Sequence, residues 1–189
     1  NPKLDPQKAK TFEVGSKWAF LDDALAVNLA LFQTDVDNEI NTTVLDDAGN
    51  PTQTGSKRVK GVELSAVGRL TDNWSVTAGY SHLDTEVKEG AKVAADGTTN
   101  LTYTPADTFT GWTSYTLPFG LTIGGGVRYA GGMHRGTDGA VGTPSFTKSY
   151  VVYDAVVSWA INDSISLRLN GYNLFDKQYV ASINKSGYR

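Results

Sequence analysis

Residues 150–179 read YVVYDAVVSWAINDSISLRLNGYNLFDKQY, and this stretch decides the fold. In its first half every second residue is apolar, namely Val151, Tyr153, Ala155, Val157 and Trp159. After a tight turn at residues 160–163 the same period resumes with Ile165, Leu167 and Leu169. Alternation with a period of two over this length predicts two β-strands joined by a short turn.

The same alternation recurs through the rest of the chain. Six further strands are predicted, at residues 11–20, 25–36, 57–70, 74–83, 108–117 and from residue 121 onward. The connections alternate strictly between short turns, at 21–23, 71–73 and 118–120, and long polar loops, at 37–56, 84–107 and 131–148. No helical period of useful length appears. The sequence therefore predicts an all-β, antiparallel fold of about eight strands.

Composition narrows the classes of protein. The chain has 189 residues, a formal net charge of −3 and no cysteine. No run of about 18 apolar residues occurs, which excludes membrane-spanning helices but not membrane-spanning strands, which need only about 9–11 residues with alternate ones facing lipid. The absence of a basic stripe argues against nucleic acid as a partner, and the absence of cysteine rules out disulfides and thiolate metal sites.

The positions of the large aromatic residues distinguish a membrane barrel from a soluble β-sandwich or lipocalin. These residues lie beside or within the predicted short turns: Trp18, Phe20, Trp74, Phe119 and Trp159. A sandwich would bury its tryptophans in the middle of its strands, whereas an outer-membrane barrel places an aromatic girdle at the lipid boundary. We therefore expect short periplasmic turns and long extracellular loops.

Strand direction predicts that the chain is a part of a larger barrel. The first strand ends in a short turn and the last one follows a short turn, so both ends of the chain are expected on the extracellular side. Complete single-chain bacterial barrels normally have both termini in the periplasm. The eight predicted strands are therefore expected to form an internal part of a larger barrel, with unpaired edges on both sides.

The heptapeptide from Asn173 to Tyr179 (Asn-Leu-Phe-Asp-Lys-Gln-Tyr) resembles the C-terminal signature of the TonB-dependent outer-membrane receptors. The signature positions are Asn173, Leu174, Phe175, Asp176 and Tyr179. Further stretches resemble family strands in the same order: LDPQ at 4–7 with FEVG at 12–15, FQTDVDN at 32–38, KGVEL at 60–64 and WTSY at 112–115. The resemblance implies a 22-stranded barrel filled by an N-terminal plug. On that register, residues 1–189 correspond to strands 14–21, without the plug and the final strand.

The resemblance also implies a function. Family members of this kind are outer-membrane receptors that transport ferric siderophores, here with a catecholate complex as a candidate ligand. The implied partners are the siderophore, the TonB–ExbB–ExbD complex acting through the plug, and outer-membrane lipid or lipopolysaccharide. Iron is then cargo held by the siderophore, and no resident cofactor is expected.

A ferric catecholate complex is anionic and carries flat rings, so cations and aromatic faces near the extracellular mouth suit it. The candidate ligand residues on this reasoning are Arg128, Trp112, Tyr115, Tyr103 and Arg135. Trp112 and Tyr115 are three residues apart on one strand, so at most one of them can point inward. The triplet Gly124-Gly125-Gly126 lacks the Lys-Ser/Thr of a phosphate loop and is expected to relieve crowding inside a strand.

Other readings stay open. The chain could belong to a structural or adhesive barrel without transport, or to a TonB-dependent receptor for a ligand other than a siderophore. An outer-membrane hydrolase would need an inward Ser-His-acid set, and no motif in the sequence frames one; we expect no catalysis. The signature also has a purely structural reading, in which Asn and Asp side chains cap the turning backbone while Leu174 and Phe175 pack at the rim.

Overall fold

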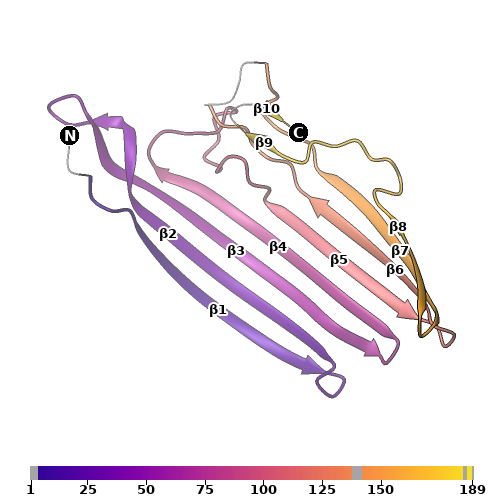
Figure 1. The fold of residues 1–189 in the computed structure, drawn as a ribbon. Helices are drawn as coiled ribbons and strands as arrows, with labels where there is room; N and C mark the ends of the chain where they lie inside the picture. Colours follow the sequence, from indigo (N-terminus) through magenta and orange to yellow (C-terminus); the bar gives the residue numbers. More distant parts are fainter. Residues whose placement is uncertain (1–3, 138–141, 185–186, 189) are drawn as a thin grey trace.

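Eight strands form one antiparallel sheet in which each strand pairs with its neighbour in sequence (Figure 1). The computed structural model describes residues 4–137, 142–184 and 187–188. The sheet contains β1 (Lys8–Phe20), β2 (Leu25–Leu45), β3 (Pro51–Thr71), β4 (Trp74–Glu89), β5 (Asp107–Thr116), β6 (Leu121–Ala130), β7 (Tyr150–Asn162) and β8 (Ile165–Gly171). A separate pair joins β9 (Ile183–Asn184) to β10 (Gly187–Tyr188).

The predicted all-β fold of eight strands is confirmed. Short turns connect the strands at one end of the sheet, while both ends of the chain and the long connections lie at the other end (Figure 1). The two longest connections are residues 90–106, between β4 and β5, and residues 131–149, between β6 and β7. Within the described residues no helix is long and apolar enough to cross a membrane.

The predicted long loop at residues 37–56 is wrong, because most of it is strand. β2 and β3 continue to Leu45 and Pro51 and leave only a tight turn between them. Asp46 makes this turn: its Oδ1 accepts the backbone N–H groups of Ala48 at 2.9 Å and Asn50 at 2.8 Å. The sequence of the hairpin is mostly polar, and its few apolar residues (Ile40, Val44 and Leu45) do not form the sustained alternation by which strands are recognised.

Ion pairs and a buried amide hold this extended hairpin together. Arg58 Nε lies 2.6 Å from Asp35 Oδ1, and Lys57 Nζ lies 2.6 Å from Glu39 Oε2. Asn41 is only 3% exposed, and its Nδ2 donates to Thr54 Oγ1 at 3.1 Å. Cross-strand polar contacts of this kind stabilise a hairpin without an apolar face.

Three further boundaries move outward. β1 begins at Lys8, before the predicted start at residue 11. β4 continues to Glu89, beyond the predicted end at residue 83. The turn predicted at residues 160–163 begins later, because β7 runs to Asn162. There Asn162 Oδ1 accepts the N–H groups of Ser164 at 2.9 Å and Ile165 at 3.0 Å, so the amide side chain closes the turn.

The two faces of the sheet differ in chemistry. One face carries large exposed apolar side chains, including Val14, Leu31, Leu64, Ile123, Val157 and Leu169. The predicted aromatic girdle lies on this face at the end with the short turns, where the indole N–H of Trp74 donates to Thr113 Oγ1 and that of Trp159 to the Phe119 carbonyl. Apolar strands ending in aromatic rings with bonded polar tips are typical of a lipid-facing wall.

Burial is sparse because the sheet is a single layer. The described apolar residues that are buried lie on the opposite face, in the long loops or in β9: Val87, Ala94, Met133, Val152, Val156 and Ile183. Val152 is the most enclosed of the large side chains, at 1% exposed. The opposite face, called the interior wall below, is mostly polar and positions the candidate site.

Candidate ligand-facing wall and rim

The interior wall consists of the residues that alternate with the lipid-facing ones along β1–β8. Strand register lines up one cross-strand row on it: Lys17, Asn28, Ser65, Gly79, Thr110 and Arg128. Asn28 Nδ2 donates to Ser65 Oγ at 3.2 Å within this row. In a membrane barrel the polar face lines the interior, so these side chains face away from lipid.

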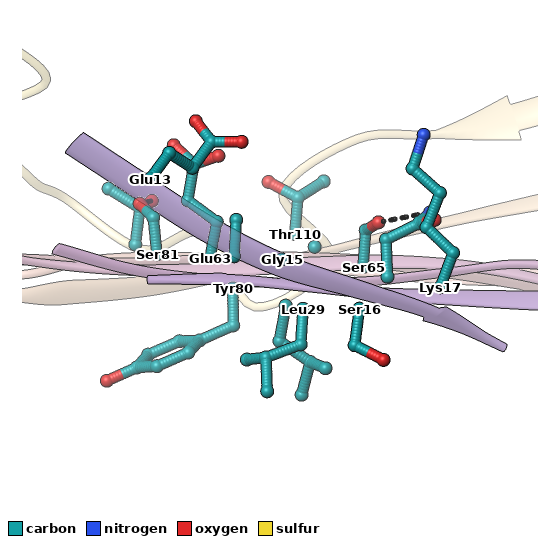
Figure 2. A pocket seen from close by; sticks show the side chains of 15 residues that line it. Glu13, Gly15, Ser16, Lys17, Leu29, Glu63, Ser65, Tyr80, Ser81 and Thr110 are labelled. Carbon is teal, nitrogen blue, oxygen red and sulfur yellow. Dashed lines mark hydrogen bonds between the residues drawn. The ribbon is translucent and has the colours of Figure 1, made fainter. Parts of the chain in front are cut away.

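A hollow of about 640 Å³ crosses the interior wall over β1–β5. Small residues such as Gly15, Ala30 and Gly79 form its floor. Figure 2 shows the carboxylates of Glu13 and Glu63 rising from that floor on the side opposite to the Tyr80 ring. Neither carboxylate forms an ion pair with another described residue. The lining also contains Lys17, so the charged side chains of the hollow are two carboxylates and one ammonium group, with a net negative charge.

Two of the five predicted ligand residues lie together on the interior wall. Trp112 pairs with Gly126 across β5 and β6, and Arg128 follows two residues later on the same face. Arg128 Nη2 lies 3.3 Å from Asp154 Oδ2, and its side chain is 52% exposed. A half-free guanidinium beside an indole is suited to an anionic aromatic group, and the ligand role of both residues stays a prediction.

Tyr115 lies on the other face. Its cross-strand neighbours are Trp74 and Ile123, both exposed on the lipid-facing side. The expectation that only one of Trp112 and Tyr115 points inward agrees with this register, and Trp112 is that residue. Tyr115 is therefore not retained as a ligand candidate.

The other two predicted residues lie in the long loops and connect them. Tyr103, in the 90–106 loop, donates its backbone N–H to the His134 carbonyl at 2.8 Å. Arg135, in the 131–149 loop, donates from Nη1 to the carbonyl and hydroxyl oxygens of Thr143 at 2.9 and 2.8 Å. Its guanidinium therefore braces its own loop, which is a structural use of that cation.

A His–Asp pair closes the two loops onto each other. His134 Nδ1 lies 2.6 Å from Asp96 Oδ2, and the backbones of Ala95 and Arg135 bond nearby at 2.8 Å. Bonds from the backbone N–H and hydroxyl of Thr98, followed by the contact with His134, hold the pKa of Asp96 below its ordinary value. Asp96 therefore remains ionised at neutral pH and fixes the imidazole.

The signature heptapeptide forms a compact turn. Asn173 adopts φ +48°, and its side chain bonds the backbone of Lys177 twice, accepting N–H at 2.9 Å and donating to the carbonyl at 3.1 Å. Its own backbone N–H donates to Asp154 Oδ1 at 2.9 Å, which ties the turn to the interior wall. Phe175 packs edge-on against Tyr153 on the lipid-facing side, with 5.4 Å between ring centroids. These contacts agree with the structural hypothesis for Asn173 and Phe175, whereas Asp176 contributes a backbone bond, from its N–H to the Asn173 carbonyl at 2.9 Å.

Sequence reasoning missed Asp154 and Asp96 as partners of predicted residues. Asp154 is a lone acid on the mixed face of β7, and only the strand register places it beside Arg128. Asp96 lies in a loop without a recognisable sequence motif, 38 positions from His134. Within the described residues, no cluster of three or more His, Asp or Glu side chains is placed to hold a metal ion.

A sheet with an apolar, aromatic-edged outer face and a polar inner face is the wall of a transmembrane β-barrel. Comparison with known proteins assigns the family. Residues 1–174 match the model of the family described as "TonB dependent receptor-like, beta-barrel". The chain belongs to the TonB-dependent receptor family, whose members are β-barrels of the outer membrane.

Individual relatives agree with this assignment. The chain is 48% identical over 184 residues to the catecholate siderophore receptor Fiu of Escherichia coli K12, covering 97% of this chain and 24% of Fiu. It is 34% identical over 197 residues to the probable TonB-dependent siderophore receptor PiuA of Acinetobacter baumannii, covering 100% of this chain and 26% of PiuA. The chain thus spans about a quarter of the length of these relatives.

Solved structures give the same answer for the fold. The closed form of Fiu from E. coli K12 superposes with a TM-score of 0.91 at 48% identity, over 98% of this chain and 26% of that one. The structure of PiuA from A. baumannii superposes with a TM-score of 0.82 at 31% identity, over 98% of this chain and 27% of that one. The sheet is therefore part of the barrel of a TonB-dependent receptor.

Proposed function

We propose that this chain is part of an outer-membrane receptor that takes up ferric siderophores with energy supplied through TonB. The identity of 48% to a receptor named for catecholate siderophores, along almost the whole chain, carries the proposal. The interior wall adds chemical support, because Arg128 and Trp112 offer a cation and an indole on one face. In this proposal iron is cargo within the siderophore, and the chain performs no catalysis.

The remaining parts of the mechanism lie in the whole protein. We place the siderophore between the extracellular loops and a plug domain that fills a 22-stranded barrel. The carboxylates of Glu13 and Glu63, which form no ion pair within the described residues, and the small-residue floor between them suit a close-fitting, cationic plug surface. The plug is the part through which TonB, with ExbB and ExbD, would act. Lipopolysaccharide and other outer-membrane lipids surround the apolar face.

Ligand titration of the full-length parent protein tests the proposal. Ferric catecholate and ferric hydroxamate complexes are added to the purified receptor, and binding is followed by quenching of tryptophan fluorescence. Sub-micromolar quenching by the catecholate complex and weak quenching by the hydroxamate is the expected result. Quenching by neither complex would contradict a siderophore receptor and favour the same architecture with another ligand.

A further inference from the structure

A second hollow of about 570 Å³, called the rim cavity below, lies where the 131–149 loop meets the segment after β8. Phe146, Thr147 and Lys148 line it from the loop, and Lys177, Tyr179 and Ile183 line it from the segment. None of the five residues predicted from the sequence as ligand contacts lines this cavity. Three of its lining residues, Lys177, Gln178 and Tyr179, belong to the signature heptapeptide. The signature therefore also contributes to a cavity outside its own turn.

The rim cavity opens on the interior side of the wall. Tyr150 alternates in phase with Val152 and Asp154, which face inward, and it pairs with Ala130 on the interior face of β6. The ring of Tyr179 stacks on Tyr150 with 4.1 Å between centroids and 26° between planes. Tyr179 and the cavity beside it therefore lie next to Tyr150, at the end of β7 that adjoins the 131–149 loop.

The loop side of the cavity is fixed by packing and backbone bonds. Thr147 is 4% exposed, and it exchanges two bonds of 2.9 Å with Met133, one from its N–H to the Met133 carbonyl and one from the Met133 N–H to its hydroxyl. Phe146 packs against His134 with 5.0 Å between centroids, and its ring occupies the space that a side chain at Gly132 would need. Phe146 nevertheless stays 48% exposed, so part of its ring is available to a ligand.

The segment side is fixed by the signature turn. The side chain of Asn173 forms hydrogen bonds with the backbone N–H and carbonyl of Lys177. The turn does not use the ammonium group of that lysine. Both walls of the cavity are thus held by bonds within the protein, and preorganisation of this kind lowers the entropic cost of binding.

The positive charge of the lining favours an anionic ligand in the cavity. Lys148 and Lys177 contribute two cations to the lining, and the lining residues that the structure describes include no carboxylate. Neither lysine forms an ion pair with another residue of the described ranges. An exposed phenyl ring, a stacked tyrosine and two ammonium groups match a flat ring that carries negative charge.

We propose that the rim cavity binds an anionic aromatic ring of the ligand, namely a deprotonated catechol ring of a ferric siderophore. Lys148 and Lys177 contact the catecholate oxygens, and Phe146 and Tyr179 contact the ring. This inference rests on the proposed siderophore function for the identity of the whole ligand, but the cavity's preference for an aromatic anion rests on its own lining.

The test uses the full-length parent protein with Lys148→Gln and Lys177→Gln combined, with Phe146→Leu, and with Lys92→Gln as a matched control on the neighbouring 90–106 loop. The signature turn uses only the backbone of Lys177, so the double variant keeps that turn. Two probes are titrated, the ferric complex of 2,3-dihydroxybenzoate and metal-free 2,3-dihydroxybenzoate, with inorganic phosphate as a non-aromatic anion. Heat-modifiable migration in gels confirms that each variant forms a folded barrel.

The double variant is expected to raise the Kd for the ferric complex at least tenfold, Phe146→Leu three- to tenfold, and Lys92→Gln less than twofold. Wild-type affinity in the folded double variant would overturn the proposal, and so would equal competition by phosphate. If the metal-free ring binds through these residues but the ferric complex does not bind, the cavity stands and the siderophore function fails. If the wild-type protein binds neither probe, both proposals fail.

Discussion

The ring of Trp112 occupies the position that a Cβ atom at Gly126 would take on the neighbouring strand. A Cβ at Gly124 would also approach Trp112, with 3.2 Å to Cζ2. The indole therefore lies on the interior wall in space left by two glycines of the triplet, whereas the glycine between them, Gly125, points to the other face. The triplet was expected to relieve crowding, and the structure shows where: Gly124 and Gly126 leave room for the Trp112 ring.

Gly126→Ala is expected to destabilise the barrel because the added methyl group overlaps the Trp112 ring. Overpacking of this kind costs about 1–3 kcal/mol. Gly125→Ala is the matched control, since its nearest contact is the Asp154 carbonyl at 3.9 Å, and it should change stability by less than about 0.5 kcal/mol. The measurement is urea unfolding of the full-length protein in liposomes. Combining Gly126→Ala with Trp112→Ala should recover part of the loss, and strictly additive losses would show that the two residues do not interact.

Arg128→Ala is expected to leave assembly intact and weaken uptake of the ferric complex. The guanidinium pairs with Asp154 at 3.3 Å but stays half exposed on the interior wall, so its exposed N–H groups are available to an anionic ligand. Loss of one charge-assisted hydrogen bond corresponds to about a tenfold loss of affinity. Arg168→Ala serves as the control, because Arg168 lies on the same face of β8 and bonds only to Asn170 in the described structure. Equal uptake by both variants and the wild-type protein would remove Arg128 from the ligand candidates.

The sequence was informative where one face of a strand is apolar and uninformative where neither face is. β5 and β6 were predicted to within one residue at the boundaries that the sequence defined. The outer part of the β2–β3 hairpin was mistaken for a loop because polar cross-strand contacts such as Asn41 with Thr54 replace the apolar alternation there. The site depended on register. The alternation of side chains along β5 showed that Trp112 and Tyr115 point to opposite faces. The contact between Arg128 and Asp154 and the residues of the rim cavity could not be predicted, because their spacing along the chain does not indicate that they lie close together.

Asn173→Ala is expected to lower the stability of the folded protein by about 1–2 kcal/mol. The substitution removes both side-chain bonds to Lys177 and puts alanine at φ +48°, a conformation that asparagine tolerates better. Asn173→Gly separates the two effects, because glycine accepts the backbone conformation but makes neither bond. Its loss should lie between those of the wild-type protein and Asn173→Ala, measured as the temperature at which the folded band disappears in gels. Equal stability of all three proteins would contradict a structural role for the signature asparagine.

Protonation of Asp46 is expected to loosen the tip of the β2–β3 hairpin at low pH. Bonds from the backbone and side chain of Asn50, with further backbone bonds from Ala48 and Gly49, lower the pKa of Asp46 from its ordinary value of 3.8. A carboxyl group whose pKa is lower in the folded state stabilises that state above its unfolded pKa and loses this effect as the pH falls through the folded pKa. Hydrogen exchange of the Ala48 and Asn50 amides, corrected for intrinsic rates, should therefore show constant protection from pH 7 to about pH 5 and a decline below pH 3.8. Asp46→Asn should give protection that no longer changes with pH, and a variant that still loses protection over the same range would assign the titration to another carboxyl group.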